Sequence, residues 1–148
     1  MSDPVCIIGL GSPFGPDRLG WLVIERLRQN HALQSFLDAH IELISADRPG
    51  LNLLHLIHDK AQVLIIDTLT NCHQPGVIYR LDKAQLLQQQ TVLSSHALGV
   101  AEALALGEKL GELSDRLVLF GLCVDPEVAD TDFEWIKEME RIVMDELS

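Results

Sequence analysis

The chain has few cysteines, and none of its apolar runs is long. Only Cys6, Cys72 and Cys123 occur in 148 residues, and no two of them form a C-x-x-C pair. A sparse, odd set of cysteines argues against a disulfide scaffold and favours a reducing compartment, so we predict a cytoplasmic protein. The first residues carry neither a basic stretch nor a long apolar segment, which argues against a signal peptide. Because no apolar run approaches membrane-spanning length, we expect no membrane insertion.

Basic residues are also scarce. The sequence has 11 lysines and arginines against 22 acidic residues, which gives a net charge of -11. Such a surface repels a phosphate backbone, so nucleic acid is not the expected partner, whereas a metal cation or a basic segment suits the charge. Apolar residues make up 47% and charged residues 22% of the chain, as in ordinary globular proteins. We therefore treat residues 1–148 as one domain with a sizeable core.

Short apolar segments alternate along the chain with segments of helical spacing. Strands are expected at residues 5–10, 41–45, 62–67, 76–81 and 116–124. Helical spacing is clearest after the first strand and at the end of the chain, where the apolar stripe consists of Phe133, Ile136, Met139, Val143 and Leu147. This alternation predicts an α/β protein with a mostly parallel, about five-stranded sheet covered by helices on both faces.

Three titratable residues fall where loops leave the carboxyl ends of predicted strands. Asp17 follows the first strand, Asp67 ends the strand at residues 62–67, and His96 lies in the first turn of a later helix. In open α/β sheets, functional residues gather at this edge. Two carboxylates and an imidazole suit a borderline divalent metal such as zinc or nickel. Each residue also has an ordinary structural interpretation, as a helix-dipole acid, a strand-end acceptor and a helix-start residue.

Other candidate groups are weaker. His55 and His58 lie three residues apart on one predicted helix, but off its apolar stripe, so we interpret them as a solvated face. Cys72 and His73 offer a thiolate and a base, but adjacent side chains usually point apart. The other two cysteines, Cys6 and Cys123, are interpreted as small buried apolar groups.

The glycines after the first strand do not form a nucleotide-binding loop. Gly9, Gly11 and Gly15 lack the G-x-G-x-x-G register, and no P-loop lysine follows them. Gly20 is expected instead to let the following helix lie close to the sheet.

Three stretches of the chain together resemble the nickel–iron hydrogenase maturation endopeptidases. They are "IIGLGSPFGPDRLGWLVIERL", "VLIIDTL" and "SSHALGV", and with their order and spacing the resemblance extends over nearly the whole chain. It implies a three-layer α/β/α sandwich and an endopeptidase that removes a C-terminal extension from a nickel-loaded hydrogenase large-subunit precursor. Asp17, Asp67 and His96 match the metal-binding side chains of that family. The resemblance implies that the substrate presents the nickel, for which zinc or another divalent metal could substitute.

Some positions depart from the pattern of that family. Ser12, Pro16 and Arg18 replace an asparagine, a second acid and a small residue, and "SADRPG" replaces a glycine-rich loop after the second strand. These differences leave open a non-catalytic nickel-binding or chaperone-like relative on the same fold. A receiver-type signalling domain is less consistent with the sequence, because the acidic pair after the first strand and the lysine after the last strand are both missing.

Overall fold

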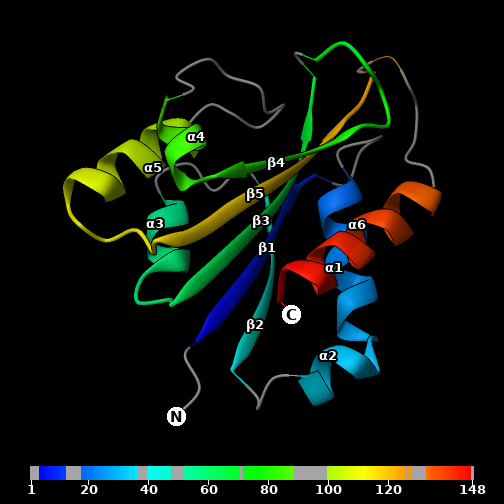
Figure 1. Cartoon of the computed structure of the whole chain (residues 1–148), viewed down its shortest axis with the longest axis horizontal. Coiled ribbons are helices and arrows are strands. Elements are labelled where there is room, and N and C mark those ends of the chain that lie inside the picture. Colours follow the sequence, from blue (N-terminus) through cyan, green and yellow to red (C-terminus); the bar gives the residue numbers. More distant parts are fainter. Residues whose placement is uncertain are drawn as a thin grey trace.

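The computed structural model describes residues 4–12, 18–36, 40–47, 52–70, 72–88, 100–125, 127 and 133–147. Within these residues, five strands form one sheet in the order β2-β1-β3-β5-β4 (Figure 1). The strands are β1 (Val5–Gly11), β2 (Ile41–Asp47), β3 (Gln62–Leu69), β4 (Ile78–Asp82) and β5 (Arg116–Cys123). The predicted five-stranded sheet is therefore confirmed.

The sheet is parallel except at one edge. β1 pairs in parallel with β2 and β3, and β3 pairs in parallel with β5, whereas β4 pairs with β5 in antiparallel orientation. The direction of β4 follows from its short connection to β3, because a parallel strand needs a crossover of a dozen or more residues. The chain leaves β3 at the carboxyl edge of the sheet, so β4 starts at that edge and runs backwards.

Helices cover both faces of the sheet. One face carries α1 (Leu19–Arg28), α2 (His31–Phe36) and α6 (Phe133–Leu147), and the other carries α3 (Asn52–Ile57), α4 (Lys83–Gln88) and α5 (Val100–Lys109) (Figure 1). None of the helices that the structure describes is long and apolar enough to cross a bilayer. The predicted three-layer arrangement is confirmed.

The central strands are buried on both faces, which explains their continuous apolar sequences. In β1, Ile7 packs into the core beneath α1 and α6, while Ile8 packs into the core beneath α3 and α5. Every residue of β1 and β3 is buried. Gly20 allows α1 to lie close to β1, as predicted, because a β-carbon at this position would lie 2.3 Å from the backbone oxygen of Leu10.

Several predicted element bounds differ from the structure. β3 continues through Leu69, so Asp67 lies two residues inside the strand and is not its last residue. The short helix α4 (Lys83–Gln88) lies between two of the predicted strands, where we expected no helix from the sequence. Phe133, the first residue of the predicted apolar stripe, is 58% exposed at the start of α6, and its ring lies 5.2 Å from the Arg26 guanidinium carbon.

Candidate functional site

Asp67 lies beside the topological switch point of the sheet. After β1 the chain moves to β2 on one side, whereas β3 lies on the other side of β1. The connections therefore diverge at the carboxyl ends of β1 and β3, and ligands of open α/β sheets bind in the crevice at such a point. The β1–β3 register ends with Gly9 beside Ile66, and Asp67 is the next residue of β3.

The Asp67 carboxylate is fully buried and held by the backbone of its own strand. It is 0% exposed, and its Oδ1 accepts a hydrogen bond of 2.8 Å from the backbone N–H of Thr68. Side chains alternate along a strand, so Asp67 faces the same side as Ile65, toward the layer of α3 and α5. A carboxylate oriented by a backbone amide is a typical metal-ligand arrangement, because ligating oxygens are themselves usually hydrogen-bonded.

The other two predicted metal ligands, Asp17 and His96, lie outside the described residues, so their assignment stays a prediction. The structure shows where the flanking chain is held: Ser12 follows β1, Arg18 precedes α1, and α5 begins at Val100. Within the described ranges, no three histidine, cysteine or acidic side chains are grouped closely enough to hold a metal ion.

The cysteines correct one expectation from the sequence. Cys72 and Cys123 form a disulfide whose Cα atoms lie 6.0 Å apart, so the interpretation of Cys123 as a free apolar cysteine is wrong, whereas the low weight that we gave to a Cys72 thiolate agrees with the structure. The two residues are 51 positions apart, and only the fold brings them together. Cys6 is the buried core residue that we expected, and burial raises the pKa of its thiol to about 12.

The histidines that were singled out lie on the surface. His55 and His58 are exposed at α3, and His58 Nε2 lies 3.2 Å from the carboxylate of Asp59, which confirms the interpretation as a solvated helix face. His73 is exposed next to the half-buried Cys72, whose sulfur is bonded to Cys123. A Cys72–His73 nucleophile and base pair is therefore not formed.

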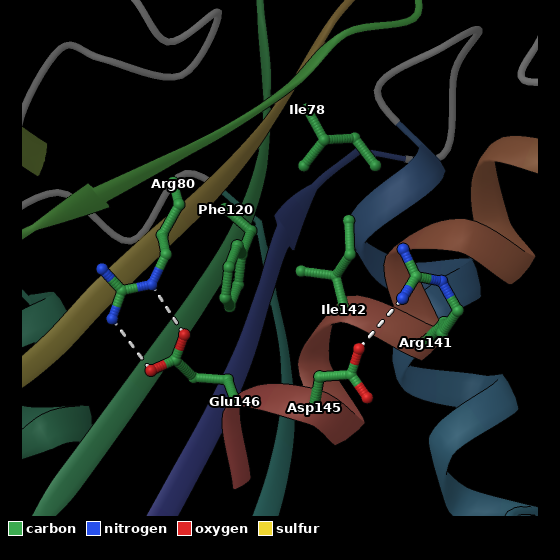
Figure 2. A pocket seen from close by; sticks show the side chains of 7 residues that line it. All are labelled: Ile78, Arg80, Phe120, Arg141, Ile142, Asp145 and Glu146. Carbon is green, nitrogen blue, oxygen red and sulfur yellow. Dashed lines mark hydrogen bonds and ion pairs between the residues drawn. The ribbon is translucent and has the colours of Figure 1, made fainter. Parts of the chain in front are cut away.

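A cavity of about 410 Å³ lies between β4 and α6, on the sheet face opposite to the Asp67 side chain (Figure 2). Its apolar part consists of Ile78, Phe120 and Ile142, and charged side chains lie at both sides. The residues that line it are Ile78, Arg80, Phe120, Arg141, Ile142, Asp145 and Glu146. Asp67, the one predicted metal ligand within the described residues, is not among them.

Both arginines of this cavity are already paired with carboxylates (Figure 2). Arg80 donates two hydrogen bonds, of 2.7 and 2.9 Å, to Glu146, and Arg141 donates one of 2.9 Å to Asp145. Hydrogen bonding to Arg80 holds the pKa of the Glu146 carboxyl below its usual value. The Arg80–Glu146 pair joins the edge strand β4 to α6, whereas the Arg141–Asp145 pair lies within α6, and neither guanidinium is left free for an anionic ligand.

Comparison with known proteins connects this fold to one family. The sequence profile of the family described as "HycI: Hydrogenase maturation protease" matches residues 21–146. The structure is similar to the hydrogenase maturating endopeptidase HybD from Escherichia coli, with a TM-score of 0.72 and 20% identity over 97% of this chain and 89% of that one. It is also similar to the [NiFe] hydrogenase maturation protease HycI from Thermococcus kodakarensis, with a TM-score of 0.65 and 18% identity over 98% and 92% of the two chains. No curated protein matches the chain.

Proposed function

We propose that this chain, which belongs to the hydrogenase maturation protease family, removes a C-terminal extension from a nickel-loaded hydrogenase large-subunit precursor. Membership of the family makes the protein a peptidase, and the solved structures that resemble it include maturation endopeptidases. The dependence on nickel and the identity of the precursor belong to the proposal.

The position of Asp67 is the observation that carries the proposal. The carboxylate lies at the carboxyl edge of the sheet, next to the switch point, on a strand buried along its whole length. A strongly apolar strand accommodates a buried acid at a cost, because removing a carboxylate from water is unfavourable without compensating partners. A buried acid at such a position is a candidate for binding a cation or for contacting a reacting group.

The positions of the described residues next to Asp17 and His96 along the chain support the proposal. α5 ends at the amino edge, where Ser114 Oγ donates a hydrogen bond of 2.6 Å to the backbone oxygen of Ala61, so α5 begins toward the carboxyl edge. His96 precedes the first residue of α5 by four positions, and Asp17 lies one position before Arg18. Four residues span at most about 14 Å, so the proposal requires His96 to act within that distance of the start of α5.

In this proposal Asp17, Asp67 and His96 lend oxygen and nitrogen ligands to the nickel that the precursor carries. This donor set suits a borderline divalent ion, and zinc or another divalent metal could substitute. A divalent cation bound there would polarise the scissile carbonyl or lower the pKa of a bound water. The role of Asp67 is to fix the position of that cation relative to the sheet, because its own backbone is held in the ladder.

The test uses nickel-loaded precursor and three variants, Asp17→Asn, Asp67→Asn and His96→Ala. Intact mass of the precursor before and after incubation measures cleavage directly. We expect each variant to reduce the cleavage rate by a factor on the order of a hundred or more, because each removes a group that positions the reaction. Thermal unfolding of each variant checks that the fold is intact.

His58→Ala and Asp145→Asn serve as matched controls, because both side chains are exposed and lie away from the predicted edge. These variants should cleave at the wild-type rate. Wild-type cleavage by all three site variants would show that the assignment is wrong. Nickel-dependent association with an uncut precursor would instead support the non-catalytic, chaperone-like relative.

A further inference from the structure

The connection between β3 and β4 passes over the carboxyl end of β5, because β5 lies between these two strands. We call residues 70–77 the crossing segment; residue 71 lies outside the described part. Backbone hydrogen bonds hold both ends of this segment. The N–H of Val124 donates to the oxygen of Leu69 (2.9 Å), and Cys123 accepts from Gly76 and donates to Val77 (both 2.8 Å).

The disulfide joins the middle of the crossing segment to the strand beneath it. Cys123 is the last residue of β5 and is 0% exposed, whereas Cys72 is half-buried on the crossing segment. Their Cα separation of 6.0 Å is ordinary for a disulfide, so the backbone brings the pair together without displacement. Cys72 follows Asp67 by five residues, so this bond holds the chain that continues directly from the candidate site.

We propose that Cys72 and Cys123 form a reversible dithiol–disulfide site that clamps the crossing segment onto the sheet edge and thereby controls precursor cleavage. The part that concerns cleavage rests on the proposed function. The clamp itself is a property of the fold that can be measured without any substrate.

The exchange chemistry follows from the accessibility of the two sulfurs. A thiolate of a dithiol reductant attacks Cys72 Sγ, because Cys72 is only half-buried whereas Cys123 is 0% exposed, and Cys123 leaves as a thiolate that takes up a proton. The second thiol of the reductant then closes its own disulfide and releases Cys72 as a thiol, so two electrons pass to the protein. Oxidation by a small disulfide, such as glutathione disulfide, reverses both steps.

The reduced state also has a place in the structure. Cys72 Sγ lies 3.2 Å from the backbone oxygen of Leu69, so a reduced Cys72 thiol has an acceptor within reach without moving. The third cysteine does not compete for either partner, because Cys6 is fully buried and pairs with Val63 in the β1–β3 ladder, several residues before the carboxyl edge. The sulfur chemistry is thus confined to one pair.

Reduction should loosen the crossing segment and leave the sheet intact. The backbone bonds of Gly76 and Val77 remain, but the only covalent tie of the described segment is lost. The chain that follows β3 beyond Asp67 would lose its covalent tie to β5, so the edge next to the candidate site would be held less firmly and we expect the reduced enzyme to cleave more slowly.

The first measurement establishes the redox couple in the full-length protein. Samples are equilibrated with buffers that differ in their ratio of reduced to oxidised glutathione. They are then denatured and alkylated, and the intact mass of the chain is measured. We expect only Cys6 to be alkylated at the oxidised end and all three cysteines at the reduced end. Cys72→Ser should show no such transition, whereas Cys6→Ala should retain it. Alkylation of all three wild-type cysteines at every ratio would overturn the proposal.

The second measurement follows amide hydrogen exchange in the two states. Reduction should raise exchange at residues 72–77 by about tenfold and leave Leu64, Ile65 and Ile66 of β3 unchanged, because local openings follow local constraints. The oxidised Cys72→Ser protein should resemble the reduced wild type. Equal exchange at the crossing segment in both wild-type states would contradict the clamp.

Cleavage is then compared after the reagent has been removed by desalting, so that it does not reach the precursor or its nickel. The reduced enzyme and Cys72→Ser should cleave on the order of tenfold more slowly than the oxidised enzyme. If the cysteine pair shows the redox transition but the oxidised and reduced enzymes cleave the precursor at equal rates, the proposal that the pair controls cleavage is wrong. If neither state cleaves while the redox transition and the exchange difference are both present, the clamp is supported and the proposed function alone fails.

Discussion

Gly9 of β1 and Gly20 of α1 contact each other so closely that neither position has room for a side chain. A β-carbon on Gly9 would lie 2.2 Å from the backbone oxygen of Gly20, well inside any real contact distance. This contact fixes the distance between β1 and α1, the two elements that residues 12–18 connect along the chain. The glycines of the opening motif thus have a packing role that is independent of any ligand.

We therefore expect Gly9→Ala to destabilise the protein strongly. The added methyl meets backbone atoms that cannot rotate away, so the free energy of unfolding should fall by about 3 kcal/mol or more. Urea unfolding followed by circular dichroism measures this loss. Gly111→Ala is the control, because nothing lies within 4 Å of its β-carbon and only its positive φ of 70° opposes the change. It should cost about 1 kcal/mol, and equal losses for the two variants would contradict the steric explanation.

The disulfide should contribute to stability through the long stretch of chain that it closes. Cys72→Ser should lower the free energy of unfolding by about 4 kcal/mol under oxidising conditions, as expected for a cross-link between residues 51 positions apart. Urea titrations with and without a dithiol reductant measure the effect. With the reductant present, wild type and variant should unfold at nearly the same urea concentration, and a difference that persists there would point to a packing role for the Cys72 sulfur.

The pair of Arg80 and Glu146 should make stability depend on pH. The hydrogen bonds that the Glu146 carboxylate accepts from Arg80 lower the pKa of Glu146 in the folded state. The charged pair therefore stabilises the fold above the ordinary glutamate pKa, and this contribution disappears as the pH falls through the lowered value. Arg80 is half exposed, so the pair should contribute at most about 1 kcal/mol.

Comparing wild type with Glu146→Gln between pH 7 and pH 2 tests this expectation. The difference in unfolding free energy should be largest at neutral pH, shrink toward zero in acid, and decrease in high salt. Glu138→Gln is the control, because the pair of Glu138 with Arg141 is exposed and lies within one helix. Its effect should be smaller; a pH-independent loss in Glu146→Gln would assign the effect to packing.

Phe133 at the start of the α6 stripe and Met139 in its middle should respond differently to truncation. Met139 is 0% exposed, so Met139→Ala should cost about 2–5 kcal/mol through lost burial and the cavity left behind. Phe133 is 58% exposed, and Phe133→Ala should cost less than about 1 kcal/mol, mainly through its contacts with the Arg26 and Lys137 cations. Thermal or urea unfolding of the two variants provides the comparison, and similar losses would contradict the burial of the stripe as described.

The sequence was most informative where burial is complete. β1 and β3 could be predicted because both faces of a central strand require apolar side chains, which leaves a continuous run that is easily recognised. The same rule predicted that Asp67 would lie at the carboxyl edge, since the strand containing it runs parallel to its neighbours.

Features that depend on strand order could not be read from local patterns. The pairing of Cys72 with Cys123 requires the connection between β3 and β4 to pass over β5, and no local signal encodes that crossing. Phe133 was misplaced for a different reason. Helical spacing predicts which side a residue faces, but at a helix end the neighbouring elements decide whether that side is covered.

β3 continues for two residues beyond Asp67, through Thr68 beside Leu122 and Leu69 beside Cys123. The backbone of Asp67 is therefore held on both sides by residues of β3 that pair with β5. The backbone of Asp67 should therefore move less than the surface loops do. Under the proposed function, an incoming polypeptide tail would have to conform to Asp67, so the length and flexibility of that tail would help to decide which chains reach the acid.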